Sequence, residues 1–132
     1  MKKIIISALC VFSLNTIIAQ TTQYNGSWAL CKIVTPQGDT QNVSANDARY
    51  MMYSFTYNNT FTALQKGENI SGVWSFDFKT KTIRIRNSIY TKTRTKLENY
   101  DIMLNQTTPN YFVEIKPESK KTFTYYIYCR IK

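Results

Sequence analysis

The sequence contains no histidine among its 132 residues. Imidazole is the usual general base of nucleophilic triads and the commonest protein ligand of zinc, so either site would have to be built without it. Acidic residues are also few, with eight Asp and Glu against 17 Lys and Arg. We therefore expect a protein that is not an enzyme and that holds neither a metal ion nor a cofactor.

The eight acidic residues are scattered along the chain, and no two have a spacing that forces a pair of carboxylates together as a glycosidase needs. A cysteine nucleophile would have no histidine beside it and would need a basic neighbour such as Lys32 or Arg130 to lower its pKa. We interpret the carboxylates as solvated turn residues. They are Asp39, Asp47, Glu68, Asp77, Glu98, Asp101, Glu114 and Glu118.

The only long apolar run lies at the N-terminus, from Ile4 to Ala19, after a basic start. This arrangement is typical of a secretory signal peptide, here residues 1–19, and no other segment approaches the roughly 18 apolar residues of a membrane-spanning helix. Cleavage would remove Lys2 and Lys3, which lowers the net charge from +9 to +7. We expect a secreted or periplasmic monomer whose mature part, residues 20–132, is one domain without a membrane span.

The mature part shows period-two alternation and recurrent turn signals, with no stretch of helical periodicity. We predict an all-β fold of eight strands joined as consecutive hairpins. Eight antiparallel strands in this order can close into an up-and-down barrel whose interior is filled by side chains or holds one small ligand. The predicted strands are residues 26–34, 49–57, 60–66, 70–77, 82–87, 97–105, 111–116 and 123–131.

Two Gly-x-Trp segments, at Gly26–Trp28 and Gly72–Trp74, favour the barrel. A glycine two residues before a tryptophan lets the backbone pass close to other strands, while the indole plugs the end of a barrel. The ten tyrosines and seven phenylalanines could fill the interior or line a cavity. The cavity candidates are Trp28, Leu30, Tyr53, Phe55, Phe61, Trp74, Phe76, Ile83, Ile85, Ile102, Leu104 and Tyr125.

Cys31 and Cys129 remain in the mature chain and would enter an oxidising compartment. The first and last strands of a closed antiparallel barrel are neighbours, so a disulfide could lock the seam. The alternation of inward and outward residues argues against this disulfide. Cys31 lies on the face opposite to that of Trp28, whereas Cys129 shares the apolar face of Tyr125. A bulge in either strand would remove the objection, and a buried free thiol is the alternative.

A run of basic residues between Asp77 and Glu98 contains no acid. Alternation places Arg84 and Arg86 on one face, which predicts a positive outer patch, and Tyr90 within the run could stack on a sugar or a base. The simpler interpretation is a charged sheet surface that stays wet, and we do not expect nucleic acid as a partner. The patch consists of Lys79, Lys81, Arg84, Arg86, Lys92, Arg94 and Lys96.

The motifs follow one another in the order Gly26-x-Trp28, Tyr53-x-Phe55, Asn59-x-Phe61, Gly72-x-Trp74, Lys81-x-Ile83-x-Ile85 and Tyr100-x-Ile102. This order resembles the lipocalin-like domain of small secreted proteins common in Bacteroidota. The resemblance implies an eight-stranded barrel that binds a small ligand in its interior. Lipocalins often place a basic residue against the first-strand tryptophan. Arg130 is the candidate here, although its parity is opposite to the apolar face of the last strand.

We weigh two functions. The leading hypothesis is a non-enzymatic exported domain that binds a small apolar or amphipathic ligand in the barrel. The rival is a protein-interaction module, such as an inhibitor, an immunity protein or an envelope-assembly partner, that uses the basic outer face to meet a protein or an anionic surface.

Overall fold

Residues 23–131 are described by the computed structural model, and all of their regular secondary structure is β-strand. The predicted signal peptide, residues 1–19, lies outside the described residues. Between residues 23 and 131 there is no helix with the length and apolar character needed to cross a membrane. The strands are β1 (Gly26–Val34), β2 (Thr40–Asn42), β3 (Met51–Phe55), β4 (Thr60–Gln65), β5 (Glu68–Asp77), β6 (Thr82–Tyr90), β7 (Tyr100–Thr107), β8 (Tyr111–Pro117) and β9 (Phe123–Ile131).

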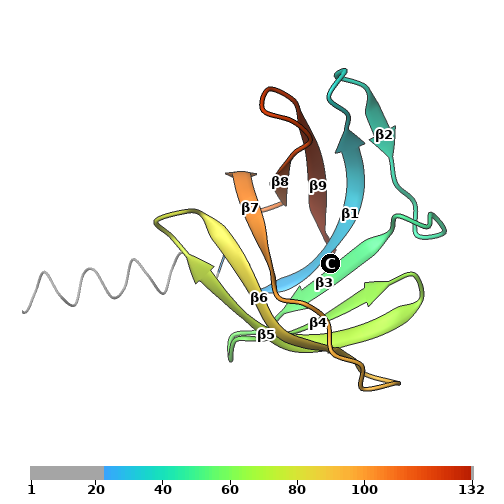
Figure 1. Cartoon of the computed structure of the whole chain (residues 1–132), viewed down its shortest axis with the longest axis vertical. Coiled ribbons are helices and arrows are strands. Elements are labelled where there is room, and N and C mark those ends of the chain that lie inside the picture. Colours follow the sequence, from blue (N-terminus) through green and yellow to red (C-terminus); the bar gives the residue numbers. More distant parts are fainter. Residues whose placement is uncertain (1–22, 132) are drawn as a thin grey trace, which may run out of the picture.

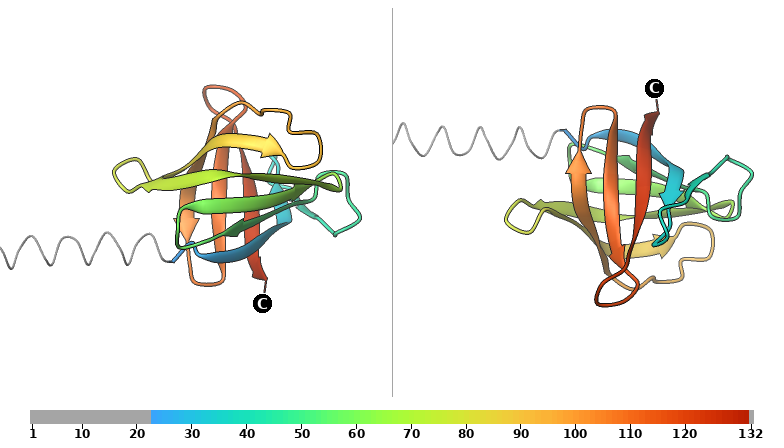
Figure 2. Two further views of the ribbon diagram at one scale, coloured as in Figure 1. Left: turned by 90° about the horizontal axis from the view of Figure 1, so that it is seen from below. Right: turned by 90° about the horizontal axis from the view of Figure 1, so that it is seen from above.

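All paired strands are antiparallel, and the sheet closes on itself because β1 pairs with β9 as well as with β3 (Figures 1 and 2). β1 and β3 to β9 therefore form an eight-stranded up-and-down barrel, which confirms the predicted fold class. β1 and β9 have the predicted bounds. The other strands differ by a few residues at their ends, most clearly β6, which continues to Tyr90, and β7, which begins at Tyr100 and ends at Thr107.

β2 is a further strand that the sequence prediction lacks. β3 pairs only with Gly26–Ala29 of β1, so the backbone groups on the same edge farther along β1 would have no partner. The chain turns back after β1, where the Thr35 amide donates to the Asp39 carbonyl oxygen at 2.9 Å, and β2 then pairs with Lys32–Val34. This short strand therefore pairs with the part of β1 that β3 does not reach.

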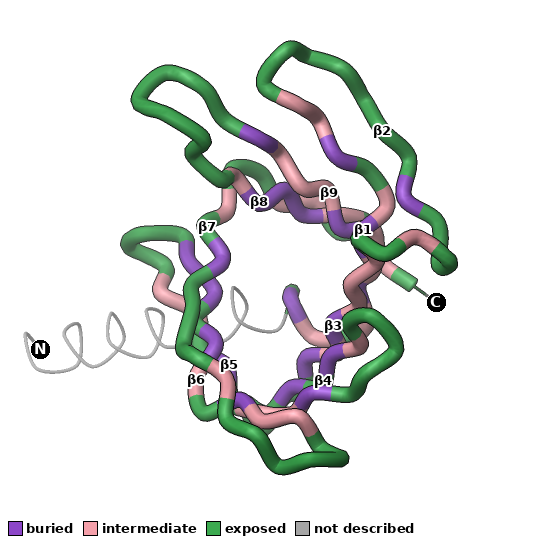
Figure 3. The backbone as a smooth tube through the Cα atoms, turned by 45° about the vertical axis from the view of Figure 1, so that its right-hand side comes forward, coloured by how far each residue is buried: buried purple, intermediate pink, exposed green. Residues whose placement is uncertain are grey.

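One end of the barrel, the end at which β1 begins, is filled by aromatic side chains, and we call it the closed end. Trp28 is completely buried, with its ring centroid 5.0 Å from that of Phe112, and Phe112 stacks on Tyr128 at 4.9 Å. On the opposite wall, Phe55 lies 4.9 Å from Trp74. Figure 3 shows the buried positions along the barrel wall and the exposed loops at its ends.

Arg130 covers the closed end. Its guanidinium lies 4.0 Å from the ring centroid of Trp28 and donates hydrogen bonds of 2.7 Å to the backbone carbonyls of Asn25 and Pro109. A cation over an indole face is attracted by the ring quadrupole. A Cβ at Gly26 would lie 2.7 Å from the guanidinium, so the glycine leaves room for this contact. Arg130 is therefore the basic residue that the resemblance implied, and it contacts the first-strand tryptophan.

Gly72, in the second Gly-x-Trp segment, allows a close approach between β5 and β6. The register of this pair shifts next to Gly72, and a Cβ there would lie 2.8 Å from the Phe61 ring and 2.9 Å from the Arg86 carbonyl oxygen. A backbone atom cannot move aside as a flexible side chain can, so a larger residue would push the strands apart.

β9 faces the opposite way from the prediction. Tyr126 and Tyr128 point into the barrel, which places Tyr125 and Cys129 on the outer face. The prediction of Tyr125 as a cavity residue is corrected accordingly. The same alternation turns Arg130 inward, so the parity objection to its contact with Trp28 also disappears.

Cys31 and Cys129 are joined by a disulfide on the outside of the closing strand pair, with Cα atoms 5.9 Å apart. Cys31 is the extra residue of a β-bulge between Leu30 and Lys32, where the pairing with β9 shifts by one position. The bridge links residues that are 98 positions apart in the sequence. It therefore connects the two strands at which the barrel closes.

Reduction of the disulfide should lower the melting temperature markedly. Because the bridge closes a loop of sequence separation 98, the chain-entropy relation gives a stabilisation of about 4.7 kcal/mol. Calorimetry with and without reductant measures the change in melting temperature. The Cys31→Ser/Cys129→Ser double variant should melt at the temperature of the reduced protein, and the reductant should not change its melting temperature. Free, alkylatable thiols at both positions in protein purified from an oxidising compartment would contradict this assignment.

Candidate functional site

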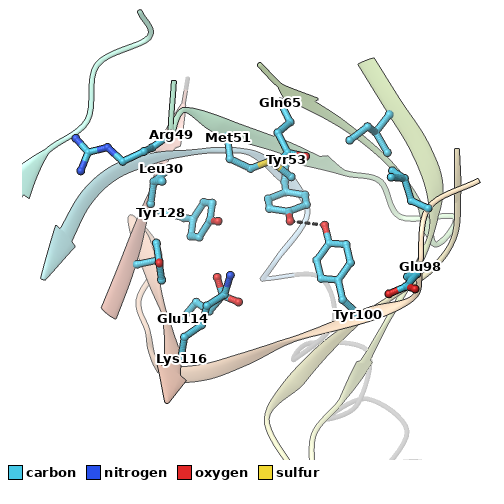
Figure 4. A pocket seen from close by; sticks show the side chains of 13 residues that line it. Leu30, Arg49, Met51, Tyr53, Gln65, Glu98, Tyr100, Glu114, Lys116 and Tyr128 are labelled. Carbon is cyan, nitrogen blue, oxygen red and sulfur yellow. Dashed lines mark hydrogen bonds between the residues drawn. The ribbon is translucent and has the colours of Figure 1, made fainter. Parts of the chain in front are cut away.

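The end of the barrel opposite Arg130 is not filled by side chains, and we call it the open end. A cavity of about 300 Å³ lies there (Figure 4). Its wall combines apolar, aromatic, hydroxyl and charged groups, as small-molecule sites commonly do. The lining residues are Leu30, Arg49, Met51, Tyr53, Gln65, Ile70, Leu97, Glu98, Tyr100, Glu114, Lys116, Tyr126 and Tyr128.

β8 illustrates how the strands supply this lining. Its inward positions are Phe112, Glu114 and Lys116, two residues apart as the pleat requires. Phe112 belongs to the aromatic core, Glu114 faces the cavity, and Lys116 is exposed at the mouth. The strand thus runs from an apolar interior to a charged rim, so the cavity has a polar floor.

Glu114 is the most unusual residue of the site. It is only 4 % exposed, and its carboxylate receives no hydrogen bond or ion pair from any other residue between 23 and 131. A buried carboxylate without a partner favours its neutral form. Burial accordingly raises the pKa of Glu114 to about 7, although the nearby charge of Lys116 opposes the rise.

Four tyrosines, which we call the tyrosine wall, surround the space that Glu114 faces: Tyr53, Tyr100, Tyr126 and Tyr128. The hydroxyls of Tyr53 and Tyr100 hydrogen-bond to each other and so connect β3 with β7 across the barrel (Figure 4). Burial raises the pKa of Tyr53, Tyr100 and Tyr128 above the usual value, so these phenols stay protonated. The wall therefore offers ring faces and neutral hydroxyls.

The two basic residues of the lining are held at the rim. Arg49 pairs with Asp47 at 2.7 Å and donates to the Gln41 side chain at 2.6 Å. The Lys116 ammonium lies 4.9 Å from the centroid of the Tyr126 ring. The charge of Arg49 is thus already compensated, and Lys116 uses the outer part of the tyrosine wall.

The predicted cavity residues separate into four groups. Leu30 and Tyr53 line the cavity, while Phe76 and Leu104 line a second hollow of about 250 Å³ near Tyr24. Tyr125 is on the outer face, as described above. The remaining candidates are buried in the core and are not among the lining residues: Trp28, Phe55, Phe61, Trp74, Ile83, Ile85 and Ile102.

Sequence reasoning missed Glu114, which was interpreted as a solvated turn residue. That interpretation is wrong, because Glu114 lies inside β8 and is buried. A signal was available in the sequence. Glu114 is preceded by Phe112 and Val113 and followed by Ile115, with no turn residue beside it. An acid within such an apolar stretch points to a buried carboxylate with a specific role.

The predicted basic patch extends over the length of the barrel. Arg84 pairs with Asp77 and Arg86 with Asp101, at 2.7 and 2.9 Å. Lys79 and Lys81 lie near the β5–β6 turn at the closed end. The three others, Lys92, Arg94 and Lys96, lie in the loop between β6 and β7 at the open end.

No cluster of three or more cysteine, aspartate or glutamate side chains that could hold a metal ion occurs in the described part of the chain. Glu114 and Glu98 both line the cavity, and the lining offers no further carboxylate.

The fold and the site define a class of protein: a closed, eight-stranded antiparallel barrel of lipocalin-like architecture with an interior cavity at one end. Comparison with solved structures agrees. A lipocalin-like protein from Bacteroides uniformis superposes with a TM-score of 0.52 at 17 % identity, over 83 % of this chain and 99 % of that one.

A duf4847 family protein from Bacteroides vulgatus is similar with a TM-score of 0.52 and 19 % identity, covering 82 % of this chain and 94 % of the other. An uncharacterized protein from Bacteroides eggerthii has a TM-score of 0.51 and 15 % identity, over 82 % and 99 % of the two chains. No protein-family model and no curated protein matches the sequence. These likenesses confirm the predicted resemblance at the level of the fold.

Glu114 should make the protein less stable as pH rises. Its folded pKa of about 7 exceeds the ordinary 4.5, so the folded state holds the proton more tightly, and this stability is complete below about pH 4.5 and lost as pH rises through 7. The difference corresponds to about 3 kcal/mol. Asp47, whose pKa Arg49 lowers to about 2, titrates below this window.

Urea unfolding of the wild type and of Glu114→Gln at about pH 5 and about pH 8 tests this prediction. The wild type should lose up to about 3 kcal/mol relative to the variant over this interval. Glu68→Gln, which alters an exposed glutamate outside the cavity, should keep the wild-type dependence. Equal pH dependence in wild type and Glu114→Gln would show that Glu114 is not buried as an acid.

Proposed function

We propose that this protein is a non-enzymatic, exported binding protein that holds a small amphipathic molecule in the open end of its barrel. The observation that carries the proposal is the buried Glu114 carboxylate, which faces a cavity of about 300 Å³ without a partner from residues 23–131. Among residues 23–131, the fully buried side-chain atoms without a hydrogen-bond partner are Asn25 Oδ1 and Ser88 Oγ. The Glu114 carboxylate instead borders the cavity, so a ligand or a water there can supply the partner that a buried polar group needs.

The division of the barrel supports this function. Aromatic packing and Arg130 fill the closed end around Trp28, so a ligand reaches the cavity that Glu114 lines from the open end. There the apolar side chains of Leu30, Met51 and Ile70 face the same space as Glu114. A molecule with one apolar part and one polar group satisfies both sets of contacts.

The cavity size narrows the choice of ligand. Its volume of about 300 Å³ lies at the lower end of the range of about 300–1,000 Å³ for small-molecule sites. A compact molecule or a short chain fits this volume better than a long-chain lipid.

Two features support export and a binding rather than a catalytic role. The disulfide between Cys31 and Cys129 suits an oxidising compartment, and it leaves neither sulfur free as a thiolate nucleophile. The predicted signal peptide, residues 1–19, agrees with export. The rival function on the basic outer face stays a prediction, and the ion pairs of Arg84 and Arg86 do not favour it.

The dye N-phenylnaphthylamine should bind saturably at one molecule per chain, because it is apolar, carries a single polar group and becomes fluorescent in an apolar site. Met51→Trp should weaken this binding roughly tenfold or more, because the larger ring occupies the cavity that Met51 lines. Fluorescence titration and native mass spectrometry measure affinity and stoichiometry.

Met103→Trp provides the matched control. Met103 is 51 % exposed on the outer face of β7 and lies outside the cavity, so this change should leave dye binding unaltered. Dye binding that is absent, unsaturable or equally weakened by both variants would contradict binding inside the barrel.

A further inference from the structure

The polar group of the ligand can be specified from what Glu114 lacks. Its carboxylate is buried and faces the cavity, and when ionised it can only accept hydrogen bonds. No donor from residues 23–131 reaches it. The missing partner is therefore a donor, and a cationic donor gives the strongest interaction with a carboxylate.

The tyrosine wall points to the same partner. A cation is attracted to the faces of aromatic rings, and several rings around one space form the usual site for ammonium groups. The wall already holds one ammonium, because Lys116 lies 4.9 Å from the Tyr126 ring centroid. That ammonium lies farther than 4 Å from the Glu114 carboxylate, so the inner part of the site is left without a cation.

We propose that the cavity selects ligands with a protonated amino group, whose ammonium pairs with Glu114 inside the tyrosine wall while its apolar part contacts Leu30, Met51 and Ile70. This inference rests on the proposed function and adds the chemical class of the ligand. Alkylamines and arylalkylamines of small size belong to this class.

The charged and titratable groups around Glu114 leave room for this pairing. Arg49 is compensated by Asp47, and the phenols of Tyr53, Tyr100 and Tyr128 stay neutral. Among the described residues, Lys116 is the basic side chain that acts on the carboxylate, and its effect is weaker than that of burial. The groups that face Glu114 are Lys116 of β8, Tyr53 of β3, Tyr100 of β7, Tyr126 and Tyr128 of β9, Arg49 before β3 and Glu98 before β7.

Proton exchange distinguishes an ammonium from other ligand groups. Below neutral pH the free site holds a proton on Glu114, because the pKa is about 7. An ammonium favours the ionised carboxylate, so that proton passes to the buffer as the amine, itself still protonated, binds. About one proton per ligand should be released near pH 6, and affinity should rise with pH and level off above 7. A neutral or anionic ligand would not produce this release.

Octylamine, octanol and octanoate test the inference, because they share a chain length and differ in the charge of the polar group. Calorimetric titration near pH 8 should show octylamine binding roughly tenfold or more tighter than octanol, with octanoate weakest. Repeating the octylamine titration near pH 6 in buffers of different ionisation enthalpy counts the released protons.

Variants assign the effect to its residues. Glu114→Gln should remove the preference for octylamine and the proton release while octanol still binds. Glu68→Gln changes the net charge equally but lies outside the cavity, and should behave as the wild type. Lys116→Gln should tighten octylamine binding a few-fold, because a like charge leaves the mouth. A cooperative unfolding transition together with dye binding confirms that each variant is folded.

Equal affinity for octylamine and octanol, or tightest binding of octanoate with its loss in Lys116→Gln, would overturn the amine inference. So would an octylamine preference that survives in Glu114→Gln. If none of the three probes binds while N-phenylnaphthylamine still does, the amine inference fails and the proposed function stands. If the dye also fails to bind, or if Met51→Trp does not weaken its binding, the proposed function fails as well.

Discussion

The pairing of β1 with β9 closes the sheet, and the arrangement of the interior depends on this closure. It runs from Ser27 opposite Ile131 to Val34 opposite Tyr125, with one bulge that carries Cys31 to the outside. Eight strands enclose a limited interior, just wide enough to be filled by side chains or to hold one small ligand. In this barrel, side chains fill the closed end, and a cavity for one small ligand lies at the open end.

The positions of the large aromatic residues along the strands decide which end of the barrel is filled and which end holds the cavity. The inward-facing residues of each strand lie one after another along the barrel. Phe112 of β8 therefore packs against Trp28 at the closed end, and Glu114, two positions later in β8, lines the cavity. Arg130 then covers the indole from the last strand and keeps solvent from that end. Strand register thus places most of the cavity lining, and the loop residues Arg49, Leu97 and Glu98 complete it.

Glu114 carries an energetic cost that the rest of the domain has to offset. A carboxylate buried without a partner destabilises the ionised protein, and the disulfide between the first and last strands adds stability of similar order. Retaining a destabilising polar group in a cavity is expected where binding requires it. This combination is what connects the stability of the fold to the proposed ligand.

The closed end of the barrel was predictable from sequence because its rules are local. Gly26 and Trp28 identified the first strand and its bounds, and clean alternation placed Ile83 and Ile85 inside. The contact of Arg130 with Trp28 was implied by the family resemblance alone, against the predicted parity of the last strand. The open end was not predictable in the same way. Apolar residues were assumed to face inward, which placed Tyr125 inside the barrel.

In β8 and β9 the assumption fails, because the inner face there borders a cavity with polar groups. The outer face carries Val113, Ile127 and the disulfide sulfur of Cys129 instead. β2 was missed for another reason, since its formation depends on an unpaired edge of β1 that only the closed sheet reveals. The sequence rules thus fail mainly beside the candidate site.

The central claim is that a buried carboxylate with no partner among residues 23–131 faces the cavity, and a carboxyl-carbon NMR titration of the ligand-free protein tests it most directly. The chain contains four glutamates, and Glu114→Gln identifies the resonance of interest. That resonance should titrate near pH 7, because burial raises the pKa of Glu114 to about 7. Titration of the same resonance near the ordinary value of 4.5 would show a solvated or already paired carboxylate and would contradict the account.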